Sequence, residues 1–143
     1  MAEEAPIAMY WQDLHVGHNV SFKFCVGQTE MNDFMNFSGD RSRIHRDTGF
    51  AQRNDFQSPV VYGAIIVAKI SYLVGMLLPG DFGLATEWKV YFNRPLYINE
   101  LAEMRGEITH VSDATRTVKL KITVLRRDEI IATAVAGSKL LNP

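Results

Sequence analysis

The chain changes its hydrophobic period near its middle. From residue 60 onward apolar side chains follow one another almost without a break, until Pro79-Gly80 ends the pattern. With Gly63 at its start, this spacing predicts a helix over 64–78 that is apolar almost all round, and we expect such a helix to be buried. Lys69, Ser71 and the glycines argue against a bilayer span of about 20 residues.

After this helix the hydrophobic period falls to two, which is typical of strands with one buried face. Strands are predicted over 87–93, 101–111, 117–125 and 129–138. The alternation is cleanest in the third, where Val118, Leu120, Ile122 and Val124 are separated by Lys and Thr. Turn-forming residues such as Ser112-Asp113 and Arg127-Asp128 lie between the runs. The second half of the chain therefore predicts an antiparallel sheet.

The first half predicts a strand, a short helix and a long polar loop. The strand covers 20–26, and Cys25 within it is expected to be a small core residue. Thr29 is the expected N-cap of a helix that carries Met31, Phe34, Met35 and Phe37. Ser38-Gly39-Asp40 ends that helix, and the loop over 40–58 contains a helical turn at 47–52.

One apolar helix followed by antiparallel strands predicts an α+β layer fold in which the sheet curls around the helix. A single sheet leaves edge strands and one apolar end of the helix to be covered. A two-fold partner could cover both by extending the sheet, so we expect a homodimer or a higher homo-oligomer.

Composition narrows the class of protein. The 143 residues fit one domain over 1–143, and 47% apolar with 22% charged residues is the balance of a globular chain. A net charge of −1 gives no basic field for nucleic acid or an anionic membrane. One cysteine and four scattered histidines provide neither a disulfide nor a metal-site spacing. The acidic start, Met1 to Pro6, does not resemble a signal peptide, so we expect a cytoplasmic protein.

The most informative segment is the polar loop together with the start of the predicted helix. It reads Phe37-Ser-Gly-Asp-Arg-Ser-Arg-Ile-His-Arg-Asp-Thr-Gly-Phe-Ala51, and Ser58-Pro-Val-Val-Tyr-Gly63 follows. This resembles the MaoC-like branch of the hotdog family, the (R)-specific enoyl-CoA hydratases and related dehydratases. Their signature runs Ser-Gly-Asp, any residue, Asn-Pro, an aliphatic residue, His, any residue and Asp, then a Pro and a Gly that opens the central helix. The matching positions are Gly39-Asp40, Ile44-His45, Asp47, Phe50-Ala51, Pro59 and Gly63.

The resemblance covers most of the chain and implies a hotdog fold and a hydratase or dehydratase. Hydration of an enoyl thioester requires a base for the water, a proton for C2 and a donor for the thioester oxygen. Asp40 and His45 could supply the first two; the resemblance implies that they bind one water and favours Asp40 as the base. Gly63 fits the third role, because a first-turn N–H has no intrahelical acceptor. The same groups would dehydrate a 3-hydroxyacyl thioester.

The chain departs from this signature at three positions. Ser42-Arg43 stands where the family has Asn-Pro, and Tyr62 precedes the glycine. Ser42 can replace the local hydrogen bonding of the amide or contact the substrate or its carrier, but the loss of proline removes a fixed φ angle. Tyr62 either points its hydroxyl into the site or packs at the start of the helix.

Three arginines surround the signature loop. Arg41, Arg43 and Arg46 suit a phosphate or carboxylate, whether on coenzyme A, on the phosphopantetheine arm of a carrier protein or on the substrate. The simpler interpretation is that these arginines are solvent-exposed surface residues that bind no ligand. Asp47 is interpreted mainly as a helix cap. No cofactor is expected beyond coenzyme A or phosphopantetheine as part of the substrate, and no metal.

Two other functions remain open from the sequence. A hotdog thioesterase has a similar fold but commonly carries an acidic residue on or beside the central helix. Residues 64–78 contain no Asp or Glu. A paralogue that only binds acyl thioesters would fit the altered Ser42-Arg43 pair, although both Asp40 and His45 are present.

Overall fold

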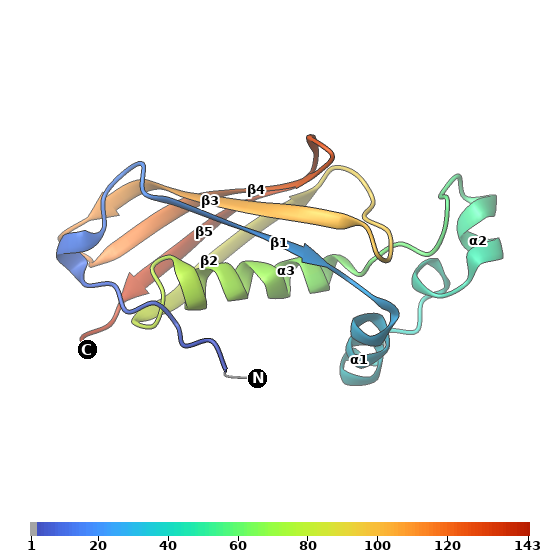
Figure 1. Ribbon diagram of the computed structural model, residues 1–143, viewed down its shortest axis with the longest axis horizontal. Helices are drawn as coiled ribbons and strands as arrows, with labels where there is room; N and C mark the ends of the chain where they lie inside the picture. Colours follow the sequence, from blue (N-terminus) through green and yellow to red (C-terminus); the bar gives the residue numbers. More distant parts are fainter. Residues whose placement is uncertain (1–2) are drawn as a thin grey trace.

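The computed structural model describes residues 3–143 as a curled antiparallel sheet with one long helix across its inner face (Figure 1). The strand order is β1-β3-β4-β5-β2, so β1 and β2 form the two edges. The strands are β1 (Asn19–Cys25), β2 (Gly83–Phe92), β3 (Leu101–Ser112), β4 (Thr117–Arg126) and β5 (Glu129–Leu140). The α+β layer fold that the sequence predicts is confirmed.

Apart from the central helix, the α-helices lie at one end of the molecule. The elements are α1 (Gln28–Ser38), a 3-10 turn η2 (Arg43–His45), α2 (Thr48–Arg53) and the central helix α3 (Gly63–Tyr72). Figure 1 shows α1 and α2 beyond the end of the sheet at which α3 begins, with the N-terminal arm and the C-terminus at the opposite end. The arm contains a short turn, η1 (Trp11–Asp13).

The alternating strands bury the face that the sequence predicts. In β4, Val118, Leu120, Ile122 and Val124 are at most 1% exposed, because they point toward α3 while their lysine and threonine neighbours point away from it. Met104 and Ile108 of β3 join the same core. Burial of side chains of this size is the main source of stability of the fold.

The central helix differs from its prediction in length and in burial. The α-helical part ends at Tyr72, and a single π turn, η3 (Leu73–Leu77), completes it. Ile66, Ile70 and Leu73 are buried against the sheet, but Ala64 and Ala68 are exposed. The expectation of burial all round is therefore wrong for this chain by itself, because one sheet covers only one side of a helix.

Three local predictions also need correction. Gly27, not Thr29, is the N-cap of α1, and its N–H donates to Glu30 Oε2 at 2.8 Å. Strand β2 begins at Gly83, earlier than its alternation indicates. Cys25 is exposed rather than in the core, because it follows the buried Phe24 and successive strand side chains point to opposite faces.

The end of α1 is as the sequence predicts and places the signature loop. Gly39 has φ 75°, a left-handed conformation that glycine adopts at low cost, and its N–H donates to the Met35 carbonyl at 2.9 Å. The chain therefore leaves the helix immediately before Asp40. No helix within residues 3–143 is long and apolar enough to cross a membrane.

Candidate active site

The carboxylate of Asp40 is held by the residue that replaces the asparagine of the signature. Asp40 Oδ1 accepts the Ser42 hydroxyl at 2.7 Å and the Ser42 N–H at 2.9 Å. These two hydrogen bonds, the hydroxyl first, hold the pKa of Asp40 below its ordinary value, and the nearby His45 contributes in the same direction. Asp40 is thus an exposed, ionised carboxylate, and within residues 3–143 no group donates to its second oxygen, Oδ2.

The imidazole of His45 is oriented by the main chain. Its Nδ1 lies 2.7 Å from the Val60 carbonyl oxygen. Because a carbonyl can only accept, Nδ1 carries the hydrogen and the neutral ring has its lone pair on Nε2. Val60 also donates its N–H to the Ile44 carbonyl at 3.0 Å, so the loop is tied at two points to the segment before α3. Nε2 is left to accept from, or donate to, a water or substrate.

Tyr62 contacts both of these residues. Its hydroxyl donates to the Asp40 carbonyl oxygen at 2.7 Å, and its ring stacks on His45 with a centroid separation of 4.0 Å and an interplanar angle of 28°. Tyr62 is 3% exposed, and burial is the main cause that raises the pKa of its hydroxyl, which stays protonated as a donor. The structure therefore shows that Tyr62 packs at the helix start with its hydroxyl bound to the loop.

Gly63 opens α3 beside a cavity of about 460 Å³. A Cβ at this position would lie 2.8 Å from Cζ of Phe92, so the glycine lets the Phe92 ring pack directly against the main chain. The cavity is mainly apolar, with His45 at its wall. Its lining residues are Ile44, His45, Phe56, Val60, Val61, Gly63, Ile66, Phe92, Asn93, Arg94, Pro95 and Leu96. Gly63 and the His45 imidazole thus line one mainly apolar cavity.

The three arginines of the loop have different surroundings. Arg43 pairs with Asp47 at 2.8 Å, and its guanidinium lies 4.6 Å from the centroid of the Phe50 ring. Arg41 and Arg46 are exposed near Tyr62, where their charges act to lower the pKa of its hydroxyl. Arg41 and Arg46 thus lie close enough to Tyr62 for their charges to act on its hydroxyl, whereas Arg43 is bound to its own loop.

Asp47 has the capping role that the sequence indicates. Its Oδ1 accepts the Phe50 N–H at 2.8 Å, at the N-terminus of α2. This backbone hydrogen bond, followed by the one from Arg43, lowers the pKa of Asp47. Both carboxylate oxygens of Asp47 are therefore occupied, which separates it from the free oxygen of Asp40.

The sequence did not indicate the cavity wall formed by 92–96. Phe92 reads as a packing residue, and Asn93-Arg-Pro95 reads only as a turn. The contact with Gly63 joins residues far apart along the chain, so neither hydrophobic period reveals it. Arg94 lies in this wall as well and pairs with Glu129 at 3.0 Å.

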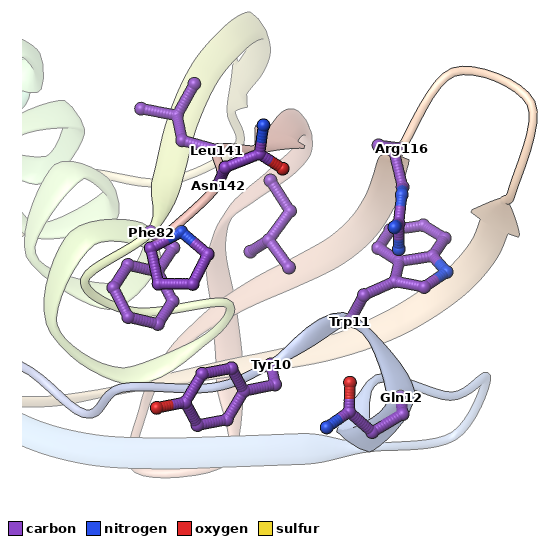
Figure 2. A pocket seen from close by; sticks show the side chains of 9 residues that line it. Tyr10, Trp11, Gln12, Phe82, Arg116, Leu141 and Asn142 are labelled. Carbon is purple, nitrogen blue, oxygen red and sulfur yellow. The ribbon is translucent and has the colours of Figure 1, made fainter.

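A second cavity, of about 140 Å³, lies at the opposite end of the sheet and includes none of the predicted site residues (Figure 2). The Trp11 Nε1–H donates to Asp113 Oδ1 at 2.7 Å, and Figure 2 shows the Arg116 side chain against the indole ring, 5.1 Å from its centroid. Tyr10 and Phe82 line the other side. These contacts fasten the N-terminal arm to the turn between β3 and β4, which is a structural role.

The fold and this loop define a class of protein. The MaoC-like domain matches residues 7–130, so the chain belongs to the MaoC-like domain family, and the resemblance of its signature loop is confirmed. The hotdog architecture is confirmed as well. An (R)-hydratase from A. caviae involved in PHA biosynthesis has a TM-score of 0.86 at 25% identity, covering 90% of this chain and 98% of that one. An R-hydratase from Pseudomonas aeruginosa has a TM-score of 0.87 at 19% identity, covering 95% and 88%.

Two curated relatives match at the level of sequence. A 3-hydroxybutyryl-CoA dehydratase of Methylorubrum extorquens is 27% identical over 132 residues, which is 92% of this chain and 84% of the relative. An (R)-specific enoyl-CoA hydratase of Rhodospirillum rubrum is 21% identical over 123 residues, 86% of this chain and 85% of the relative.

Proposed function

We propose that this protein is a carbon–oxygen lyase that interconverts a 2-enoyl thioester and a 3-hydroxyacyl thioester. The observation that carries the proposal is the hydrogen bond from His45 Nδ1 to the Val60 carbonyl. It leaves Nε2 available at a cavity that also contains Gly63 at the start of α3. The family, and relatives named as a dehydratase and a hydratase of CoA thioesters, support the same reaction class.

In the hydration direction, one water lies between Asp40 Oδ2 and His45 Nε2. Asp40 takes a proton from this water as the new bond to C3 forms, and the electrons of the double bond move toward the thioester carbonyl. The Gly63 N–H donates to the carbonyl oxygen as its negative charge grows, where the positive end of the α3 dipole adds to the effect. The proton that Asp40 took from the water passes to the lone pair of His45 Nε2 and from there to C2, which returns both residues to their starting states, and the reverse sequence dehydrates the product.

The environment of each group fits its role. Asp40 needs to be ionised, and its two hydrogen bonds from Ser42 favour the ionised form. His45 needs one free nitrogen, which its main-chain hydrogen bond provides. No redox or metal chemistry is required for water addition, so we propose no cofactor other than the coenzyme A or phosphopantetheine of the substrate.

A second copy of the chain is part of the proposal. Strand β2 is an edge of the sheet, and its inward-facing Trp88 and Phe92 are 39% and 54% exposed. Phe92 packs against Gly63 at the start of α3, the helix whose Ala64 and Ala68 are also exposed. Pairing of two β2 edges would cover this apolar surface and close the cavity beside Phe92, so we propose a homodimer with the site at its interface.

The carrier and the compartment are proposed from charge and composition. Arg41 and Arg46 are exposed beside the site and suit the phosphates of coenzyme A or an acidic carrier protein. The CoA thioesters in the names of the relatives favour coenzyme A, with a short acyl chain as in 3-hydroxybutyryl-CoA and the (R) configuration at C3. A single cysteine fits the reducing cytoplasm.

The test is incubation of the full chain with crotonyl-CoA while enoyl absorbance and free thiol are followed together. Loss of absorbance without thiol supports the proposal. Release of thiol without hydration would identify a thioesterase. If a panel of enoyl-CoA and enoyl-carrier substrates shows neither hydration nor thiol release, the protein only binds acyl thioesters. The same panel, with chains of different length and charge, identifies the acyl group and the carrier.

A further inference from the structure

We propose that Tyr62 is a positioning residue that fixes Asp40 and His45 relative to each other, in place of the fixed geometry that proline gives the signature loop. The inference rests on the proposed function, because it assigns Tyr62 a role through those two residues. It starts from three contacts: the hydroxyl on the Asp40 carbonyl at 2.7 Å, the ring on His45 at 4.0 Å, and the peptide bond to Gly63.

The ring of Tyr62 determines the plane of the His45 imidazole. The hydrogen bond from Nδ1 to Val60 fixes one atom of the imidazole but permits the ring to turn about that bond. Stacking at an interplanar angle of 28° removes this freedom, so the direction of the Nε2 lone pair is set by Tyr62. The tyrosine ring itself is backed by Phe34 of α1, at a centroid separation of 4.7 Å.

The hydroxyl of Tyr62 determines the position of the Asp40 main chain. Both Ser42 hydrogen bonds to Asp40 are local, two residues along the chain, and they orient the carboxylate without anchoring the loop. The loop is anchored at Ile44 and His45 by Val60. Within residues 3–143, the Tyr62 hydroxyl supplies the hydrogen bond that joins Asp40 to the start of α3, 22 positions along the chain.

The chain needs such an anchor at this position. With Ser42-Arg43 where the family signature has Asn-Pro, no proline ring restricts the φ angle of residue 43, and more loop conformations are accessible. A buried hydroxyl is costly unless it is hydrogen-bonded, so the contact is retained whenever Tyr62 is buried. One side chain thus orders the base, the imidazole and, through the peptide bond, the oxyanion donor.

The experiment compares Tyr62→Phe, which keeps the ring, with Tyr62→Leu, which removes the stack as well. Tyr72→Phe is the matched control, since Tyr72 is also on α3 and donates its hydroxyl to Glu4 at 3.2 Å, away from the site. We expect Tyr62→Phe to lower kcat for crotonyl-CoA about tenfold and Tyr62→Leu about a hundredfold, with KM within about twofold of wild type. Tyr72→Phe should leave both constants unchanged.

A readout without turnover separates this inference from the proposed function. Stacking on Tyr62 should shift the NMR signals of the His45 ring protons, assigned by their loss in His45→Ala. In Tyr62→Leu these signals should return to the positions of an unstacked histidine, and in Tyr62→Phe they should stay shifted. If wild type shows the shift but does not hydrate any enoyl thioester, the proposed function fails and the positioning of His45 stands.

The inference is overturned if Tyr62→Phe retains wild-type kcat, or if Tyr62→Leu leaves the His45 signals unchanged. Should Tyr62→Leu not fold, Tyr62→Phe decides by itself: it preserves the buried ring and changes only the hydrogen bond to Asp40. A tenfold fall in its kcat at unchanged melting temperature supports the inference, and an equal loss in Tyr72→Phe contradicts it, since that loss would not be specific to the site.

Discussion

The sheet and the signature loop of this protein are held in place by different interactions. Strands β3, β4 and β5 are joined by main-chain pairing along their length, with one register shift in each pair, and inward side chains such as Met104 and Ile122 are fully buried. The loop over 39–47 has mostly exposed side chains and is fixed by hydrogen bonds from Ser42 and Tyr62 and by the one that His45 donates to the Val60 carbonyl. Stability therefore resides mainly in the sheet and the proposed chemistry in the loop, so mutations in the two regions should separate the two properties.

The largest effect on stability should come from the sheet. Ile122→Ala removes a fully buried side chain from the central strand β4 and should lower the free energy of unfolding by about 2–5 kcal/mol. Because the strand lies away from the loop, activity per folded molecule should stay near wild type. Denaturant titration and an activity assay on the same sample check this. A loss below about 1 kcal/mol would contradict the assignment of the core.

The largest effect on activity should come from the loop. Asp40→Asn and His45→Ala should each lower kcat/KM for the enoyl thioester by at least about two orders of magnitude, because each removes a group that handles a proton. The melting temperature should not fall. Asp33→Asn, which changes an exposed carboxylate on α1, is the control with wild-type activity. Full activity in either loop variant would show that the substituted residue is not part of the active site.

The hydroxyl of Ser42 should influence how the activity depends on pH. Asp40, the proposed base, can accept a proton only when it is ionised, and the hydrogen bonds from Ser42 lower the pKa of Asp40. Ser42→Ala removes the hydroxyl bond, so the pKa of Asp40 should rise and the acid limb of the kcat/KM profile should move to higher pH. Rate profiles of wild type and variant measure this shift. A limb that stays in place or moves to lower pH would exclude Asp40 as the titrating base.

A smaller effect on stability is expected at the edge of the loop. Asp47→Ala removes the N-cap of α2, so the melting temperature should fall by a few degrees. The exposed pair with Arg43 adds little. Since the carboxylate of Asp47 is hydrogen-bonded to Phe50 and Arg43 and not to Asp40 or His45, kcat should change less than about threefold. Thermal melts and steady-state kinetics test both statements, and a hundredfold loss of kcat with no loss of stability would make Asp47 a member of the site.

The smallest effect should come from the arginines. Arg43 is already paired with Asp47, so Arg43→Glu should raise KM only a few-fold, whereas Arg41→Glu and Arg46→Glu should raise KM more for the carrier that the protein uses. Kinetics on matched CoA and carrier-protein substrates compare the three. If all three variants have the same KM on both substrates, the arginines are solvent-exposed residues that do not bind the carrier.

The sheet was more predictable from the sequence than the site. Alternation in β4 and the glycine at position 39 are local signals, and both led to the observed structure. The stack of Tyr62 on His45 and the approach of Phe92 to Gly63 depend on how distant segments pack. Neither the spacing of hydrophobic residues nor the turn-forming residues predict such contacts. The exposed face of α3 was missed for a related reason, because apolar composition does not reveal what covers a helix.

The most direct test of the account is the fate of crotonyl-CoA in isotopically labelled water, followed by mass spectrometry with wild type and Asp40→Asn. If Asp40 activates the water, wild type forms intact 3-hydroxybutyryl-CoA with the labelled oxygen at C3, and Asp40→Asn forms it at least about a hundredfold more slowly. Labelled oxygen in free crotonic acid, or equal rates for the two proteins, would contradict it.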